Sequence, residues 1–276
     1  MKIWRNGALV DSAGAVSATD RGFSLGDGVF ETLCFDAGRL ADFEAHMARL
    51  RQGADHFAIP IAYADRTLAE GCGAVVAANA LESDRAAIRI TLTRGSGPRG
   101  LAPAPGATPQ ILIQASPSSR EPPAAARLAV VSIRRNPTSP AARFKTLSYA
   151  DNILALMEAR RLGADDALML TIDGDAACSP AANFFIIDKD QILTPPLNAG
   201  VLPGVVRSRL LELAPTIGLE AAETALALHQ VRESFSFLTN SLMGLRRVAA
   251  IDGAPCPPAS AAFIRLREAF EAVRFD

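Results

Sequence analysis

Lys145 is the residue whose type and setting first suggest chemistry. It lies in RFKTLSYADNILA, residues 143–155, and is one of only three lysines in a chain with 25 arginines. A lone lysine is usually a solvated surface charge, but small and hydroxyl residues surround this one, and Tyr149 is one of only two tyrosines. A buried lysine has a lowered pKa and becomes a nucleophile suited to Schiff-base chemistry. On this segment alone, both interpretations stay open.

The segment NAGVLPGVVRSRLL, residues 198–211, contains a second chemically suggestive pattern. Gly200 and Gly204 flank Pro203, and an amphipathic helix is expected to start at Gly204. The backbone N–H groups at a helix start have no partner inside the helix and can bind a phosphate group. The same pattern also fits an ordinary loop that caps a helix, so it identifies no ligand by itself.

Three more segments place polar side chains where they could meet a ligand. His46 and Arg49 are three residues apart in HMARL, which puts them on one face of an expected helix. Arg94 and Arg99 lie in the glycine-rich segment LTRGSGPRGLAP, where guanidinium groups could pair with a carboxylate. FLTNSLMG, residues 237–244, ends a strand in hydroxyl and amide groups. A polar helix edge, a flexible turn and a strand end would explain the same residues without a ligand.

Composition limits the classes of protein that remain. The 276 residues are 49% hydrophobic, enough to bury a sizeable core, and the net charge is −1. A nucleic-acid-binding or membrane-surface protein would usually show a basic patch, so neither partner is expected. The start of the chain lacks the apolar stretch of a signal peptide, and no segment could span a bilayer. The scattered cysteines show no CxxC spacing, so reduced thiols in a cytoplasm are expected. Four scattered cysteines and three histidines show no metal-ligand spacing, so no metal site is expected.

Periodicity predicts the elements that position these residues. Asn6-Gly7 and Asp36-Ala37-Gly38 are hairpin turns between apolar runs. Apolar residues at helical spacing predict helices, and alternation of apolar and polar residues predicts strands. The expected helices cover residues 43–57, about 61–80, 150–163, a stretch from Gly204, and about 258–273. The expected strands cover residues 86–94, 109–115, 127–133, 234–240 and 246–253, with two more strands within 166–188 joined near Asp173-Gly174.

The segment SPSSREPPAAA, residues 116–126, divides the chain. It is rich in serine and proline and poor in large apolar residues, which predicts an interdomain linker. It separates an N-terminal α+β domain, residues 1–115, from a C-terminal α+β domain, residues 127–276, that carries Lys145. Strands cluster into hairpins with helices grouped between them, so two α+β domains fit better than a doubly wound parallel sheet.

The order of these segments resembles the fold-type IV pyridoxal-phosphate enzymes, which include branched-chain and D-amino-acid aminotransferases and aminodeoxychorismate lyase. The resemblance implies a two-domain fold of the D-amino-acid aminotransferase type with pyridoxal 5′-phosphate as the cofactor. It also implies a homodimer whose active site lies between the domains, with a loop from the neighbouring subunit. The matching motifs run from residue 20 to residue 244 and are DRGFSLGDGVFET, HMARL, LTRGSGPRG, KTLSYADNILA, AANFF, GVLPGVVR and TNSLMG.

The resemblance assigns roles to individual residues. It implies that Lys145 carries the cofactor as a Schiff base and moves protons once the substrate amine displaces it. An arginine cannot form that linkage because it stays protonated. The resemblance further implies that the cofactor phosphate is bound by Arg49, Ser241 and the backbone N–H groups of Val205 and Val206, that Tyr149 lies near the phenolic oxygen, and that Arg99 binds the substrate carboxylate. Arg94, in the same glycine-rich segment, is a second candidate for binding the substrate.

Cys178 and Val206 depart from the family pattern. The family usually has a glutamate five residues before the asparagine of NFF, where it keeps the cofactor's pyridine nitrogen protonated; five residues before Asn183 stands Cys178. A thiol carries no charge at neutral pH unless it is activated, so the ring would be a weaker electron sink. Alternatively, Cys178 is a packed small hydrophobe and a shifted alignment hides the true partner. Val206 stands where relatives often have a hydroxyl residue.

Two motifs, TRGSGPRG and TNSLMG, are most similar to aminodeoxychorismate lyase, which splits 4-amino-4-deoxychorismate into 4-aminobenzoate and pyruvate. This is the expected reaction, because aromatisation drives it and a weak electron sink harms it less than transamination. A class IV aminotransferase acting on branched-chain or D-amino acids is the alternative, although Leu101 stands where D-amino-acid aminotransferases often have a histidine. A cofactor-binding relative without catalysis is a third interpretation, which Cys178 and Val206 keep open.

Overall fold

The computed structural model describes residues 1–275 and contains helices and strands along the whole chain. Contacts divide the chain into two compact units. The first unit comprises Met1–Arg120, Lys145–Ser148 and Phe275, and the second comprises Glu121–Phe144 and Tyr149–Arg274. Each unit has a sheet and a hydrophobic core of its own.

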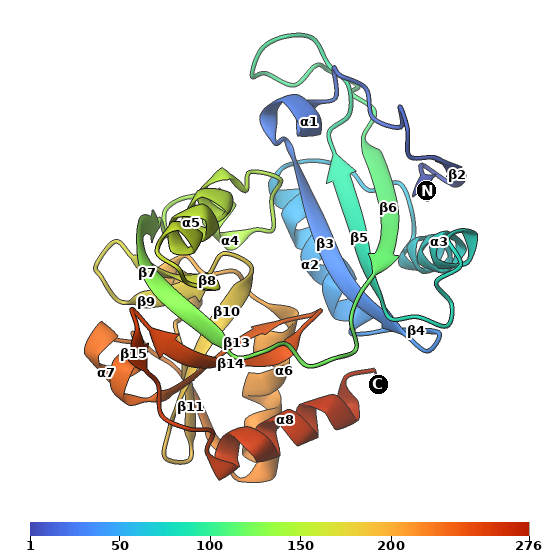
Figure 1. The fold of residues 1–276 in the computed structure, drawn as a ribbon. Helices are drawn as coiled ribbons and strands as arrows, with labels where there is room; N and C mark the ends of the chain where they lie inside the picture. Colours follow the sequence, from blue (N-terminus) through green and yellow to red (C-terminus); the bar gives the residue numbers. More distant parts are fainter. Residues whose placement is uncertain (276) are drawn as a thin grey trace. The chain divides into compact units, whose positions relative to one another are not determined.

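The first unit is built on a six-stranded sheet in the order β2-β1-β6-β5-β3-β4, in which every neighbouring pair is antiparallel (Figure 1). Two longer helices, α2 and α3, contact this sheet. Its elements are β1 (Lys2–Arg5), β2 (Ala8–Asp11), α1 (Arg21–Leu25), β3 (Gly28–Asp36), β4 (Arg39–Leu40), α2 (Phe43–His56), α3 (Asp65–Ala78), β5 (Ala86–Thr93) and β6 (Gln110–Pro117).

The two predicted hairpins of this unit are confirmed. Asn6 and Gly7 turn between β1 and β2 with φ angles of 47° and 97°, and Ala37 and Gly38 turn between β3 and β4 with φ angles of 47° and 82°. Two successive positive φ angles match the right-handed twist of the flanking strands. The turn residues therefore explain why both hairpins were visible in the sequence.

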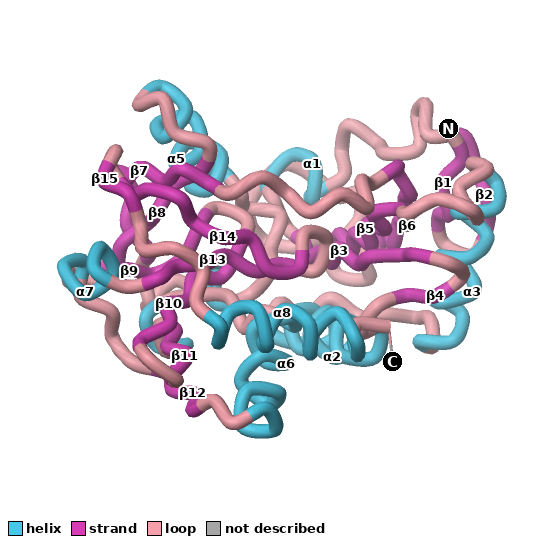
Figure 2. The backbone as a smooth tube through the Cα atoms, turned by 60° about the horizontal axis from the view of Figure 1, so that its bottom comes forward, coloured by secondary structure: helices cyan, strands magenta, loops and turns pink. Residues whose placement is uncertain are grey.

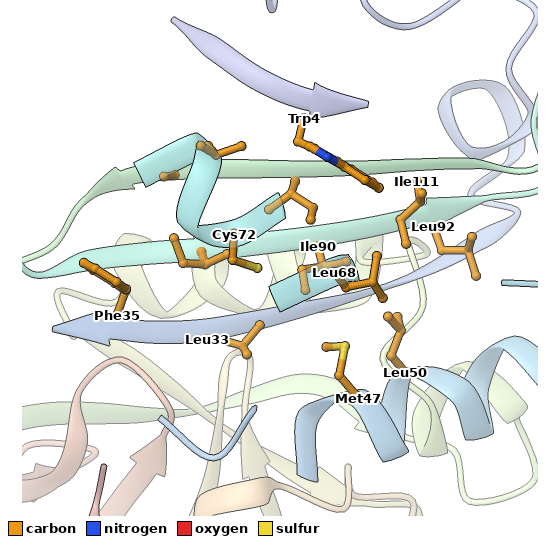
Figure 3. Close-up of a cluster of buried hydrophobic side chains, with 14 of the residues drawn as sticks. Trp4, Leu33, Phe35, Met47, Leu50, Leu68, Cys72, Ile90, Leu92 and Ile111 are labelled. Atoms are coloured by element: carbon orange, nitrogen blue, oxygen red, sulfur yellow. The ribbon is translucent and has the colours of Figure 1, made fainter. Parts of the chain in front are cut away.

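The core of the first unit lies between the sheet and its helices. Alternation in β5 turns Ile90 inward, where Figure 3 shows it among Leu33 of β3, Met47 of α2 and Leu68 of α3. All four side chains are fully buried. Burying a side chain of this size contributes about 1.5–3 kcal/mol, so this cluster holds α2 against the strand that carries Glu31.

The second unit contains a nine-stranded mixed sheet. Its order is β12-β11-β10-β13-β14-β7-β8-β9, with β15 paired to β14, and a further pairing of β9 with β10 closes six of the strands into a ring. The strands are β7 (Ala126–Arg135), β8 (Asp166–Thr171), β9 (Ala176–Ser179), β10 (Ala182–Asp188), β11 (Gln191–Thr194), β12 (Glu220–Glu223), β13 (Phe235–Asn240), β14 (Gly244–Ile251) and β15 (Ala254–Pro255).

Helices cover parts of this second sheet. Figure 2 shows α6 and α8 side by side, and Phe263 of α8 packs against Phe237 of β13 with ring centroids 5.4 Å apart. Helix α5 contacts β7 and β8. The helices of the unit are α4 (Pro140–Arg143), α5 (Ala150–Arg161), α6 (Val205–Leu213), α7 (Leu228–Glu233) and α8 (Ala261–Val273), with short 3₁₀ turns at Leu197–Ala199 and Ala214–Ile217.

Several predicted elements need correction. Residues 166–188 form three strands rather than two, because β9 and β10 are separated only by a turn at Pro180 and Ala181. The second helix begins at Asp65, four residues later than expected. Helices α1, α4 and α7 and strands β11 and β12 were not expected; all five elements are only four to six residues long, too short to show a periodicity in the sequence.

Candidate active site

Lys145 lies in a segment that pairs with β3 of the first unit. The N–H of Phe30 donates to the Lys145 carbonyl at 2.9 Å, and the N–H of Leu147 donates to the Gly28 carbonyl at 2.9 Å. A side chain at Gly28 would lie 2.3 Å from the Leu92 carbonyl oxygen, so only glycine lets the segment, β3 and β5 approach this closely. Phe30 lies under the lysine, with Nζ 4.5 Å from the ring centroid.

The surroundings of Lys145 lower its pKa from 10.5 to about 8. Burial of the amine is the largest cause, the positive charge of Arg49 is the next, and Arg89 adds a smaller effect; the charge of Glu31 acts in the opposite direction. Arg89 also lies over the Phe30 ring, with Cζ 3.7 Å from the centroid. The amine of the half-buried Lys145 therefore has a pKa that suits a nucleophile and proton carrier near neutral pH.

A buried ion cluster lies beside this lysine. Glu31 of β3 accepts from Arg49 of α2 at both carboxylate oxygens, with each N···O distance 2.7 Å, and His46 Nδ1 lies 2.7 Å from Glu31 Oε2. Glu31 and His46 are fully buried. Burial raises the pKa of Glu31, but the charge and fork of Arg49, helped by His46, outweigh it and lower that pKa to about 2. His46 and Arg49, which the sequence places on one face of a helix, thus both bind the Glu31 carboxylate.

The two candidate substrate arginines, Arg94 and Arg99, have different surroundings. Arg94 donates through Nε and Nη2 to Asp27, and through Nη1 and Nη2 to the carbonyls of Ala58 and Phe57. Its guanidinium is therefore engaged within the first unit. Arg99 is exposed in the loop that follows β5. Of the two arginines, only Arg99 is exposed to solvent, so Arg99 is the candidate that could bind a carboxylate.

In the second unit, α6 begins as the sequence predicts. Gly204 is the residue before its first turn, no side chain caps it, and Val205 and Val206 are its first two residues. A Cβ on Gly204 would lie 2.0 Å from Asn183 Oδ1, and Asn183 Nδ2 donates to the Leu202 carbonyl at 2.9 Å. Strand β10 therefore fixes the loop that leads into the helix, and the first backbone N–H groups of α6 point out of the helix end.

A buried hydroxyl lies on the neighbouring strand. Thr239 of β13 is directly opposite Asn183 of β10, so the two side chains share one face of the sheet. Thr239 Oγ1 is buried and has no hydrogen-bond partner among the residues that the structure describes. Ser241 follows at the end of β13, and its carbonyl accepts from Arg274 at 2.8 Å. Donors at a helix start together with an unpaired buried hydroxyl suit an anion such as a phosphate.

Cys178 lies on β9, paired with Met169 of β8 and Asn183 of β10. It is buried, and burial raises the pKa of its thiol; Arg135 opposes this shift and Asp166 adds to it. The thiol is therefore neutral at physiological pH. Tyr149, the residue before the first turn of α5, is half-buried.

Comparisons with known proteins identify the family. The family model of class IV amino-transferases matches residues 28–251. The branched-chain-amino-acid aminotransferase of Salmonella typhimurium is 30% identical, covering 91% of this chain and 85% of that protein. The chain belongs to the class IV aminotransferase family.

Solved structures agree with this assignment. The branched-chain aminotransferase of Escherichia coli superposes with a TM-score of 0.90 at 25% identity, covering 99% of this chain and 94% of that one. A Legionella pneumophila protein described as a "putative 4-amino-4-deoxychorismate lyase" has a TM-score of 0.87 at 27% identity, covering 93% and 94%. The predicted fold-type IV architecture is confirmed.

Class IV aminotransferases use pyridoxal 5′-phosphate, which is therefore the cofactor of this chain. The residues fit that group in three respects. Within the first unit, Lys145 offers an amine of lowered pKa. Within the second unit, α6 begins without a side-chain cap and Thr239 keeps a buried hydroxyl unpaired among the described residues. Among residues 1–275, no group of histidine, cysteine and acidic side chains could hold a metal ion, and no helix is long and apolar enough to cross a membrane.

Sequence reasoning did not single out three residues of this class IV aminotransferase that the structure brings forward: Glu31, Asp27 and Thr239. Glu31 left a signal, since an acidic residue stands in the middle of the apolar run GVFETLCF. A carboxylate on a buried strand needs a cationic partner, and HMARL supplies two candidates. Thr239 lies in FLTNSLMG, whose hydroxyl and amide groups the sequence does bring forward, but a threonine in a strand is ordinary and nothing marks this hydroxyl individually.

The lowered pKa of Lys145 leads to a direct test. In cofactor-free protein, labelling of Lys145 by acetic anhydride is expected to reach half of its maximal rate near pH 8. At pH 8 the fraction of neutral amine should be roughly a hundredfold that of a lysine with the ordinary pKa of about 10.4. Mass spectrometry of peptides gives the rate at each lysine, and the exposed Lys189 gives the reference rate in the same samples. A midpoint above pH 10 at Lys145 would contradict the proposed environment.

Proposed function

We propose that Lys145 forms the covalent link to pyridoxal 5′-phosphate and is the acid–base catalyst of the reaction. The observation that supports this role is its position over Phe30 with a pKa lowered to about 8. The other two lysines, Lys2 and Lys189, are exposed. When it is bound, the cofactor supplies an electron-withdrawing ring that stabilises negative charge at the substrate carbon bearing the amino group.

The remaining residues bind and orient. Once the substrate amine has displaced it, the Lys145 amine takes the proton from the carbon that bears the amino group and later returns one. The first N–H groups of α6, at Val205 and Val206, donate to the cofactor phosphate, and this role rests on the uncapped helix start. For the phosphate contacts of Arg49 and Ser241 and the contact of Tyr149 with the phenolic oxygen, the support is the family resemblance.

We propose elimination from 4-amino-4-deoxychorismate as the reaction. The amino-bearing carbon loses its proton, the enolpyruvyl ether bond breaks, and the leaving group takes up a proton to become pyruvate while the ring becomes 4-aminobenzoate. Cys178 supports this choice, because its raised pKa keeps the thiol uncharged and leaves the cofactor ring without an anionic partner at this position. Because formation of the aromatic product drives the elimination, the reaction needs less stabilisation of negative charge by the cofactor ring.

Transamination is the second candidate, and a specific observation favours it. The sequence relatives include branched-chain aminotransferases at 30% identity and a Bacillus licheniformis D-alanine aminotransferase at 26% identity. Leu101, where D-amino-acid aminotransferases often have a histidine, favours branched-chain over D-amino acids. If the protein instead binds the cofactor without catalysis, neither the elimination products nor transfer of an amino group will be observed.

One assay separates these candidates. Purified holoenzyme is expected to release 4-aminobenzoate and pyruvate in equal amounts from 4-amino-4-deoxychorismate, followed by chromatography. Transfer of the amino group from L-leucine to 2-oxoglutarate is expected to be slow. The reverse pattern would establish the aminotransferase, and inactivity in both assays would support the relative without catalysis.

Replacing Cys178 with glutamate tests why the chain prefers elimination. The Cys178→Glu protein is expected to transfer the amino group of L-leucine at least about tenfold faster, because a carboxylate beside the ring nitrogen would keep it protonated and strengthen the electron sink. Cys178→Ser is the matched control, since a hydroxyl is also uncharged. Equal transfer rates in wild type, Cys178→Ser and Cys178→Glu would contradict the role given to this position.

We also propose that the protein is a homodimer, as the resemblance implies. Helix α5 supports this, because Ile153, Leu154 and Met157 are about half exposed on its outer side while Ala155 and Ala159 are buried on its inner side. Large apolar side chains exposed together on one helix often mark a protein–protein interface. Light scattering of the purified protein gives its mass in solution, and replacing Ile153 and Met157 together with glutamate should lower it to that of one chain.

A further inference from the structure

Arg99 lies in the loop after β5, and the hydrogen bonds to residues 98–103 of this loop come from one side chain. Arg21 of α1 donates through Nη1 to the Gly100 carbonyl at 2.9 Å and through Nη2 to the Leu101 carbonyl at 2.7 Å. No other hydrogen bond to residues 98–103 is found within the described part of the chain. Both accepting carbonyls directly follow Arg99 in the chain. The position of Arg99 therefore depends on Arg21.

Arg21 is itself held firmly. Its Nε donates to Asp27 at 2.8 Å, and the residue is only 4% exposed. Its backbone N–H donates to the Gly95 carbonyl at 2.9 Å, and a Cβ on Gly97 would lie 3.2 Å from Arg21 Cδ. The loop thus passes directly over the arginine side chain, and glycine at position 97 permits the close approach.

Asp27 links this anchor to the helix of the ion cluster. The same carboxylate that accepts from Arg21 accepts from Arg94 Nε at 2.8 Å and Nη2 at 3.1 Å. Burial raises the pKa of Asp27, but hydrogen bonds from Arg94 and Arg21 outweigh it and lower that pKa, so the carboxylate is charged. Arg94 also donates to the carbonyls of Phe57 and Ala58, directly after α2. A continuous chain of charged contacts runs from the end of α2 to the loop.

We propose that Arg21 is the positioning residue that fixes the loop presenting Arg99 and so sets the affinity for the substrate carboxylate. The inference rests on the proposed role of Arg99 in binding that carboxylate. Arg94 then belongs to the anchor and not to the substrate-binding set. A binding group is effective only where the residues behind it lock its position, and Arg21 supplies that support from α1.

Limited proteolysis tests the anchor without substrate. Trypsin must draw residues around the Arg99–Gly100 bond into an extended conformation, which the two hydrogen bonds from Arg21 oppose. The Arg21→Lys protein keeps a charge for Asp27 but cannot reach both carbonyls. We expect cleavage after Arg99, followed by mass spectrometry, to be roughly tenfold faster than in wild type, because hydrogen bonds to a charged group shift an equilibrium at least this far.

Arg51→Lys is the matched control. Arg51 donates through Nε to Asp65 at 2.9 Å and through Nη2 to the Tyr63 carbonyl at 2.9 Å, so it also joins one carboxylate and one carbonyl in the first unit. Its cleavage rate after Arg99 should match wild type. Asp27→Asn is a second variant that should also accelerate cleavage. Wild-type cleavage rates in both Arg21→Lys and Asp27→Asn would overturn the anchor.

Kinetics tests the consequence for recognition. In holoenzyme acting on 4-amino-4-deoxychorismate, Arg21→Lys is expected to raise KM roughly tenfold and to change kcat less than twofold. The double variant Arg21→Lys/Arg99→Ala should have the KM of Arg99→Ala alone, since both changes remove one interaction. Additive effects would overturn the positioning role. An unchanged KM in Arg99→Ala would instead refute the proposed role of Arg99. The proteolysis experiment would still show whether Arg21 holds the loop.

Discussion

Replacing Lys145 with arginine is expected to abolish turnover, by at least about a thousandfold, in a protein that stays folded. Acid–base catalysis by a positioned side chain alone contributes about 10²–10⁴-fold, and loss of the covalent link to the cofactor adds to this. Arginine keeps a positive charge over the Phe30 ring, which lies 4.5 Å from Nζ in the wild type. Its guanidinium neither forms the link nor releases a proton near neutral pH.

Two measurements check this expectation. One is the rate of product formation with saturating cofactor. The other is reduction with borohydride, which should fix the cofactor on the peptide containing residue 145 in wild type and on no peptide in Lys145→Arg. Lys189→Arg is the control, since it makes the same substitution at an exposed site. Turnover within tenfold of wild type in Lys145→Arg, or a cofactor fixed at another residue, would contradict the proposed mechanism.

Composition is what singles out Lys145 in the sequence. A chain that uses arginine for most of its positive charge makes each lysine informative, and the structure favours the buried interpretation over the surface charge. The charged neighbours that lower its pKa could not be predicted, because Arg49 and Arg89 lie far from Lys145 in the chain. Only tertiary contacts bring these charges together.

Arg94 and Arg99 illustrate a limit of motif reasoning. Both are arginines in one glycine-rich segment, so a pattern treats them alike. The structure separates them, because Asp27 and the carbonyls after α2 engage Arg94 while Arg99 is exposed. Asp27 is 67 residues away from Arg94, and no local spacing indicates such a pair.

The fold was predictable where elements are long or end in turn residues. Helix α2 and the hairpin at Asn6-Gly7 follow from periodicity and turn chemistry. The division of residues 166–188 was missed because all four residues of β9 are buried, so the strand shows no alternation of apolar and polar residues. A strand buried on both faces and a turn of two residues leave a single apolar run in the sequence.

Replacing Glu31 with glutamine is expected to give the largest loss of stability, about 3–5 kcal/mol. Removing one partner of a buried ion pair leaves the other charge uncompensated. Glu31 holds both carboxylate oxygens within 2.7 Å of Arg49, whose side chain is only 10% exposed. It also fixes His46 on the buried side of α2. Glu44→Gln is the control, because Glu44 is exposed on the same helix and should change stability by less than about 1 kcal/mol.

The pH dependence identifies the charge of Glu31 as the cause. Its pKa is about 2 in the folded protein and about 4.5 when unperturbed, so its ionisation favours the folded state above about pH 4.5. That contribution is lost as pH falls from about 4.5 to about 2. Urea unfolding should therefore show the full difference between wild type and Glu31→Gln at pH 7, and a smaller one at pH 3. A difference independent of pH would assign the loss to packing instead.

Glu31→Gln should also alter Lys145 in a predictable direction. The Glu31 charge raises the pKa of Lys145, opposing burial and Arg49. Its removal should lower that pKa below about 8 and move the midpoint of Lys145 labelling to lower pH. Glu44→Gln should leave the midpoint unchanged. Because a cavity or a misfolded helix would not shift this midpoint in a fixed direction, the shift separates an electrostatic role of Glu31 from a structural one. An unchanged midpoint would mean that the buried cluster stabilises α2 without tuning the lysine.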